Sequence, residues 1–236
     1  MVAAQRHATT SSGGPAASYP DRVSEFTGFP VSALDFYDDL EVDNTRSFWE
    51  KHKETYAESV RAPMTALCAA LAPEFAPDGR SGKVFRPYRD VRFAKDKTPY
   101  KTHQGAFVAA GPATGWYVEL SARGLRVGAG FYEASGPRLA AIREAMADDV
   151  TGPQLEELVA AYDRDGWEIG GEQLKTSPRG YPADHPRIAL LRRKQLFVGR
   201  PYGFDDLDDP AVLHRVRADW RALRPLVEWI AAHAVE

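Results

Sequence analysis

The sequence has only one cysteine, Cys68, among its 236 residues. A single cysteine excludes a disulfide within the chain, so a reducing, cytoplasmic compartment is expected. Cys68 lies in the apolar run 64–71 and is interpreted as a buried apolar side chain rather than a nucleophile. No apolar run reaches the roughly 20 residues that a membrane span needs. Because residues 1–20 also lack the apolar core of a signal peptide, we expect no membrane partner.

Motifs of several enzyme and binding classes are absent as well. The chain has no Gly-x-Ser-x-Gly elbow, which argues against a serine hydrolase, and no glycine-rich phosphate loop. His52, His103 and His185 show no short ligand spacing, so no metal site is predicted, and the sequence names no cofactor. The net charge of −3 and the lack of a recognition module argue against duplex nucleic acid as a partner.

The N-terminal residues are rich in Ala, Ser, Thr, Gly and Pro and contain almost no large apolar side chain. Such a segment cannot offset its ordering entropy by burial. We therefore predict a flexible tail over residues 1–22 and a single domain over residues 23–236, which is long enough to bury one sizeable core.

Apolar periodicity predicts helices on both sides of a β-rich centre. Trp116, Val118 and Leu120 alternate with polar or amphipathic neighbours, and the turn at 122–124 leads to a second alternating run over 125–131. The fold predicted is α+β, with a mainly antiparallel sheet over about residues 83–131 packed against flanking helices. The expected helices are a long one after residues 43–45 that is interrupted at Pro63 and ends at Pro73 and Pro77, two over 139–146 and 155–162, one of about ten residues after Asp184, and one over 213–230 bent at Pro225.

Charge is distributed unevenly along the chain. Residues 79–104 contain eight Lys or Arg and two Asp, a local charge of +6, and residues 175–200 also carry +6. The other residues therefore carry −15, the difference between −3 and +12. Prolines and aromatic residues interrupt the first stretch, so it is not a solvated helix face. Because it holds charge of one sign on irregular, anchored backbone, the first stretch predicts a site for an anion. If the two stretches meet, an anion or acidic residues must lie between them, since like charges about 4 Å apart repel by on the order of 4 kcal/mol near a protein surface.

The two basic stretches supply the predicted ligand-binding residues. Arginine offers a rigid fork of donors that suits carboxylate or phosphate, and lysine binds phosphate as a compact charge. The second stretch repeats the order of the first, with a Lys, a hydroxyl, a Pro, a cation and an aromatic residue over 175–181. A small anionic ligand is therefore predicted to bind Arg86, Arg89, Arg92, Lys97, Tyr100, Lys101, Lys175 and Arg179.

Two aspartates in the first stretch are candidate catalytic residues. Asp96 is the candidate general base, and Asp90 is expected to orient an arginine. The same residues can instead form an internal Arg–Asp network that ties the loop to the core. Whether the ligand is also turned over stays open. The alternative function is a non-enzymatic binding or scaffold module whose basic surface meets an acidic protein or single-stranded nucleic acid. An enzyme site should be concave, whereas a partner surface should be flat.

Long motifs in this chain resemble a bacterial family catalogued as domain of unknown function 2461, over roughly residues 26–200. The resemblance implies an intracellular bacterial protein with no settled activity, and it supplies no catalytic residue. The motifs are Arg86-x-x-Arg89-Asp90-x-Arg92-Phe93-x-x-Asp96-Lys97-x-Pro99-Tyr100-Lys101-Thr102, Gly130-Phe131-Tyr132, Leu174-Lys175-Thr176-x-Pro178-Arg179-Gly180-Tyr181 and Asp184-His185-Pro186, with Asn44, Arg46 and Trp49 in an early helix.

Overall fold

The computed structural model describes residues 25–79 and 82–235, so the predicted tail over 1–22 lies outside the described residues. At the centre is a six-stranded sheet with the order β1-β2-β3-β4-β6-β5, in which all neighbouring strands are antiparallel. The predicted α+β fold with a mainly antiparallel sheet is confirmed. The strands are β1 (Lys83–Val84), β2 (His103–Gly111), β3 (Thr114–Ser121), β4 (Gly124–Phe131), β5 (Glu168–Gly170) and β6 (Leu196–Gly203).

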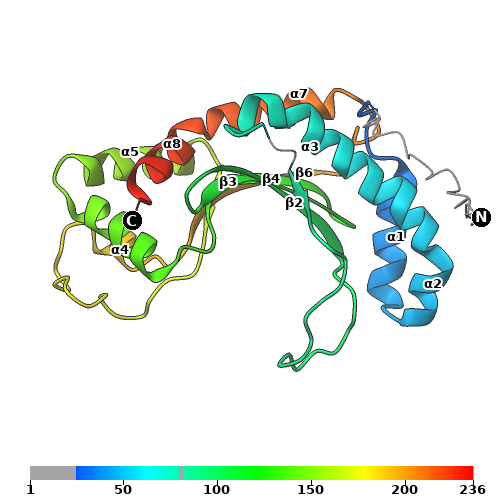
Figure 1. The fold of residues 1–236 in the computed structure, drawn as a ribbon, viewed down its shortest axis with the longest axis horizontal. Helices are drawn as coiled ribbons and strands as arrows, with labels where there is room; N and C mark the ends of the chain where they lie inside the picture. Colours follow the sequence, from blue (N-terminus) through cyan, green and yellow to red (C-terminus); the bar gives the residue numbers. More distant parts are fainter. Residues whose placement is uncertain (1–24, 80–81, 236) are drawn as a thin grey trace, which may run out of the picture.

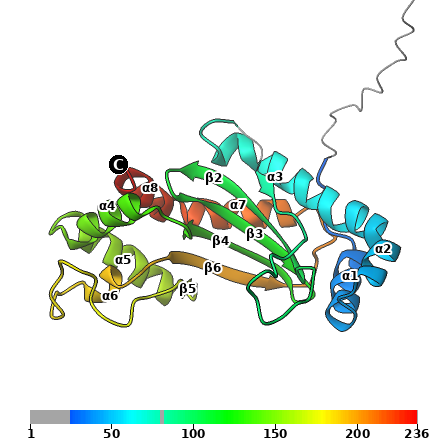
Figure 2. The same cartoon turned by 60° about the horizontal axis from the view of Figure 1, so that its bottom comes forward.

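The sheet has one face covered by helices and one open face (Figures 1 and 2). Trp116 of β3 is buried on the covered face, where its indole N–H donates to the backbone oxygen of Phe75 at 3.0 Å and its ring stacks on Trp220. Side chains alternate along a strand, so Tyr117 and Glu119 of β3 belong to the other side, which we call the open face. Cross-strand register places His103, Gly105, Phe107, Gly115, Arg126 and Gly128 on this same face.

The helices before the sheet follow one another with few breaks. The second helix begins after residues 43–45, as the sequence predicts. Its cap is Thr45, whose hydroxyl accepts the backbone N–H of Phe48 at 3.2 Å. Pro63 lies in the first turn of α3, directly after a π-helical segment. Proline has no backbone N–H and cannot continue the hydrogen-bond ladder of a helix, so the regular ladder is interrupted at this point of the chain. Pro73 lies inside α3 and does not end it. The elements are α1 (Val31–Val42), α2 (Arg46–Thr55), η1 (Tyr56–Arg61) and α3 (Ala62–Phe75).

Cys68 lies in α3 with its side chain buried in the core. Burial raises the pKa of its thiol to about 12, so the thiol stays protonated and unreactive at neutral pH. The interpretation of Cys68 as a buried apolar residue is confirmed.

The helices after β4 form two groups. Three of them make a lobe at one end of the sheet, and the last two run along the covered face (Figure 1). The predicted helix of about ten residues after Asp184 is wrong: α6 has four residues, because the chain then enters β6, where Leu196 and Val198 are buried against the core. The lobe contains α4 (Gly136–Ala147), α5 (Thr151–Arg164) and α6 (Ile188–Leu191); α7 (Val212–Ala222) and α8 (Arg224–His233) follow β6, and Pro225 lies in the first turn of α8.

Candidate functional site

Residues 85–102 leave the sheet between β1 and β2 as an extended arm (Figure 1). Two backbone hydrogen bonds join its sides: the N–H of Arg89 donates to Pro99 O at 2.9 Å, and the N–H of Lys101 donates to Pro87 O at 2.7 Å. The backbone is therefore that of an irregular hairpin. Arginines at every third position do not share one side of such a hairpin, as they would on a helix.

The arm is fastened to α2 through Tyr100. Its ring lies flat on the indole of Trp49, with centroids 4.4 Å apart, and only 5% of the residue is exposed. The side-chain amide of Asn44 accepts the backbone N–H of Tyr100 at 3.1 Å and donates to its backbone oxygen at 3.0 Å. The sequence predicts that Tyr100 binds the ligand, and its ring could cover a ligand only if this stack opened.

Within the arm, several predicted ligand-binding cations contact other arm residues. The guanidinium of Arg89 pairs with the Asp96 carboxylate at 2.5 Å and also contacts the hydroxyl of Thr98. The ammonium of Lys97 donates to the backbone oxygen of Val91 at 2.8 Å. These contacts are the internal network that the sequence left open as an alternative, and they shape the arm itself.

The two candidate catalytic aspartates belong to the same network. Asp90 accepts two side-chain bonds from Arg92, at 2.7 and 3.0 Å, and these bonds lower the pKa of its carboxyl. The backbone N–H of Thr98 and the guanidinium of Arg89 together lower the pKa of Asp96 to about 2. A carboxylate with so low a pKa is a weak base at neutral pH. The catalytic roles of Asp90 and Asp96 stay predictions, and their contacts give both residues a structural role.

Three cations lie close together at the base of the arm: Lys83 and Lys101 over the ring of Phe85, and Arg86 near enough to Lys101 to affect its charge. The ammonium groups of Lys83 and Lys101 lie 5.8 and 5.5 Å from the centroid of the Phe85 ring. Burial, and then the charges of Arg86 and Lys83, lower the pKa of Lys101. Among residues 25–79 and 82–235, no carboxylate pairs with any of these three cations. Lys83 was not among the predicted site residues, although it lies within the first basic stretch.

A second polar group adjoins these cations on the open face. The hydroxyl of Tyr117 donates to Glu119 Oε2 at 2.5 Å, and His103 Nε2 lies 3.8 Å from the same oxygen. Burial and the neighbouring carboxylate raise the pKa of Tyr117. Gly105 makes room for this group, since an added Cβ would lie 2.8 Å from the Tyr117 hydroxyl and 3.1 Å from the Phe85 ring. Sequence reasoning missed the group, although the alternation along β3 places Tyr117 and Glu119 on one face.

The second basic stretch lies at the other end of the molecule. Lys175 and Arg179 are exposed in the segment between β5 and α6, whereas the arm lies at the opposite end of the open face in both ribbon views (Figures 1 and 2). The structure thus brings Arg86 and Lys101 together and keeps Lys175 and Arg179 apart from them.

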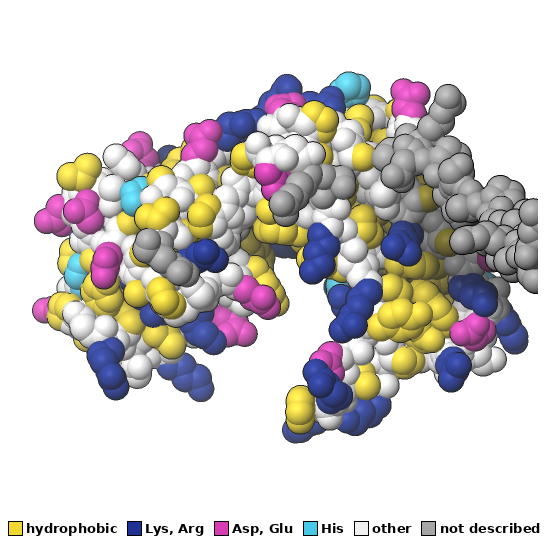
Figure 3. Space-filling model, viewed as in Figure 1, with side chains coloured by type: hydrophobic (Ala, Val, Ile, Leu, Met, Phe, Trp, Pro, Cys, Tyr) yellow, Lys and Arg dark blue, Asp and Glu magenta, His cyan; other side chains and the backbone are white. Residues whose placement is uncertain are grey.

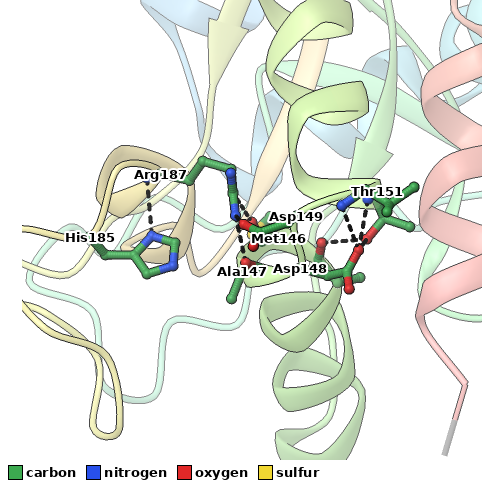
Figure 4. A network of polar contacts seen from close by, with 9 residues as sticks. Met146, Ala147, Asp148, Asp149, Thr151, His185 and Arg187 are labelled. Carbon is green, nitrogen blue, oxygen red and sulfur yellow. Dashed lines mark hydrogen bonds and ion pairs between the residues drawn. The ribbon is translucent and has the colours of Figure 1, made fainter.

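Arg187, in the same basic stretch, is a structural residue (Figure 4). Its buried guanidinium donates to Met146 O at 2.8 Å and to Ala147 O at 2.6 Å, and so satisfies the last carbonyls of α4. It also pairs with Asp149 at 2.8 Å. Gly152 leaves the necessary space, because a Cβ there would lie 2.5 Å from Arg187 Nε.

The space-filling view shows the molecule hollowed between the lobe and the arm, below the open face of the sheet (Figure 3). Two further depressions, of about 560 and 400 Å³, are lined mainly by helix residues and contain none of the predicted site residues. Within the described ranges, no cluster of three or more His, Cys, Asp or Glu could hold a metal ion. No helix in the described part of the chain is both long and apolar enough to cross a membrane.

The fold and the basic arm define an α+β protein with a one-sided antiparallel sheet. The chain belongs to the family described as conserved hypothetical protein (DUF2461), whose model matches residues 32–229. This match confirms the resemblance stated from the sequence and extends it through α7 and into α8. No curated protein sequence matches the chain.

Proposed function

We propose that the protein binds a small anionic ligand, bearing phosphate or carboxylate, in the hollow between the arm and the open face. Arg86 and Lys101 would hold the anion, with Lys83 as a third cation. The observation that supports the proposal is this cluster, in which two ammonium groups lie over one ring beside the charge of Arg86. Among the described residues, no carboxylate forms an ion pair with any of the three cations.

The electrostatics of this cluster favour an anion. Two neighbouring cations and partial burial already lower the pKa of Lys101, so its charged form is destabilised in the free protein. An anion between the cations would offset both effects. The guanidinium of Arg86 can bind a carboxylate or phosphate through two parallel hydrogen bonds, and the lysines add compact charge.

The other residues predicted to bind the ligand have different roles in this proposal. Arg89, Arg92 and Lys97 shape the arm through their contacts with Asp96, Asp90 and Val91. Lys175 and Arg179 would reach only a ligand that extends across the hollow. The proposal concerns binding, and turnover is not part of it. The single buried cysteine supports a reducing cytoplasm as the place of this function.

The test is the melting temperature in phosphate, sulfate or citrate at matched ionic strength. At a hundredfold excess over the dissociation constant, a ligand that binds only the folded state stabilises it by about 2.7 kcal/mol. We expect this gain in the parent protein and a much smaller one in Lys101→Met. Lys51→Met is the control, because it removes the same charge from an exposed position on α2. Equal gains in all three proteins, or none in the parent, would overturn the proposal.

One observation favours the alternative of a binding module. Phe93, in the arm, is 96% exposed, and the Arg92 guanidinium lies 5.9 Å from its ring. An exposed aromatic residue beside a cation is a common anchor at interfaces. This function predicts salt-sensitive binding to polyglutamate or a single-stranded oligonucleotide that is lost in Phe93→Ser, without saturable binding of small anions.

A further inference from the structure

The carboxylate of Glu119 lies on the open face without a strong cationic partner. Arg126 is its direct cross-strand neighbour, yet the Arg126 guanidinium pairs with Glu168 instead. Among the described residues, the only basic group within 4.0 Å of the Glu119 carboxylate is His103, at 3.8 Å, and an imidazole carries charge only when it is protonated. Glu119 accepts one hydrogen bond, from Tyr117, and its side chain is 24% exposed.

This carboxylate adjoins the basic cluster at the base of the arm. Tyr117 links the two groups, since its hydroxyl contacts Glu119 and its ring centroid lies 6.5 Å from that of Phe85. The ring of Phe85 in turn carries Lys83 and Lys101. The open face therefore carries two lysine ammonium groups beside Phe85 and the Glu119 carboxylate beside Tyr117, and these two aromatic rings are neighbours.

Glu119 does not neutralise the cations. No ion pair joins it to Lys83, Arg86 or Lys101 within 4.0 Å among the described residues. A close carboxylate would raise the pKa of Lys101, whereas burial, Arg86 and Lys83 lower it. The three cations and the Glu119 carboxylate thus all remain available to contact a ligand.

We propose that the ligand is a small zwitterion, an amino-phosphate or amino-carboxylate, whose anionic group meets Arg86 and Lys101 and whose ammonium group meets Glu119. This inference rests on the proposed function, because it names the class of ligand for the same site. An ammonium group suits Glu119 better than a hydroxyl does, because an ammonium compensates the charge of the carboxylate and also donates hydrogen bonds.

The test compares ligands that differ only at one end, by calorimetric titration of the parent protein. Phosphoethanolamine is matched with propyl phosphate and 2-hydroxyethyl phosphate, and β-alanine with butyrate. We expect the ammonium compound to bind at least about fivefold more tightly than its matched partners, the value of an ion pair worth about 1 kcal/mol. Equal affinity of the ammonium, methyl and hydroxyl compounds would overturn the inference.

Two variants assign the preference to Glu119. Glu119→Gln keeps an acceptor for the Tyr117 hydroxyl but removes the charge. The fivefold ratio between the affinities for phosphoethanolamine and propyl phosphate should therefore fall to about one, while propyl phosphate binds as well as before. Glu156→Gln removes the same charge from an exposed position on α5 and should keep the ratio. A ratio that persists in Glu119→Gln would contradict the inference even though anions bind. If neither the matched compounds nor inorganic phosphate bind the parent, the proposed function fails, and this inference fails with it.

Discussion

The ring of Tyr100 lies parallel to the indole of Trp49, with an interplanar angle of 9° and centroids 4.4 Å apart. This contact joins the end of the arm to the second helix, two elements that are separated by about fifty residues of chain. The position of Lys101, the next residue, therefore depends on packing that is remote from the sheet.

Replacing Tyr100 tests this dependence. Tyr100→Ala removes a buried aromatic ring and should lower the free energy of unfolding by about 3 kcal/mol, because Trp49 loses its stacking partner. Urea unfolding measures the change. Phe93→Ala is the control, since Phe93 lies in the same arm but is 96% exposed, and it should cost less than about 1 kcal/mol. Similar losses in both variants would show that the stack does not hold the arm.

Asn44 makes a second attachment of the arm, through both backbone polar groups of Tyr100. Asn44→Ala should lower the free energy of unfolding by about 1–3 kcal/mol, because it leaves two partly buried backbone groups without a partner. Asn44→Asp should cost at least as much at neutral pH, since a carboxylate cannot donate to the Tyr100 oxygen. A small cost for Asn44→Asp would contradict this account of the contact.

The carboxyl of Asp96 should titrate at about pH 2 in the folded protein. Its pKa is depressed below the unfolded value, so its stabilising effect is present above the unfolded pKa and is lost as the pH falls through the folded pKa. Arg89→Met should raise this pKa only in part, because the first cause of the shift is the backbone N–H of Thr98. Carbon-13 NMR of the carboxyl follows the titration, and an unshifted aspartate in the parent would contradict the pairing.

Gly152 is predicted to be intolerant of a side chain. In Gly152→Ala the new Cβ would meet Met146 O at 2.4 Å and Arg187 Nε at 2.5 Å. Because this disturbs the buried cap of α4, the free energy of unfolding should fall by about 1–3 kcal/mol. Gly136→Ala is the matched control, since no atom lies within 4 Å of a Cβ there, and thermal melting compares the two. Equal stability of both variants would count against the packing of Arg187.

Local patterns predicted most of the fold. The alternation in β3 and β4 marks the central hairpin because one of their faces is buried. The spacing of the C-terminal apolar residues marks a helical region, which was predicted as one helix bent at Pro225 and is divided into α7 and α8 just before that proline. Strand β6, which lies between β4 and β5 in the sheet, was not predictable in the same way. It contains Pro201 and follows a run of cations that resembles a helix end.

The candidate site was predictable as a region but not as a set of contacts. The excess of positive charge in 79–104 is visible in the sequence, yet the sequence does not say which cations find a carboxylate. Arg89 reaches Asp96, seven residues away, only because the arm folds back on itself. Glu119 and Lys101 lie beside the Phe85–Tyr117 pair because β2 pairs with β3 in a particular register. That register is a property of the tertiary structure.

The most direct test of the central claim is the pKa of Lys101, followed through its ε-carbon by NMR with and without saturating phosphate. Without ligand, Lys101 should titrate below an ordinary lysine, because burial and the nearby charges of Arg86 and Lys83 disfavour its charged form. An anion bound between these cations must raise that pKa. A pKa of Lys101 that is unchanged by phosphate would contradict the account.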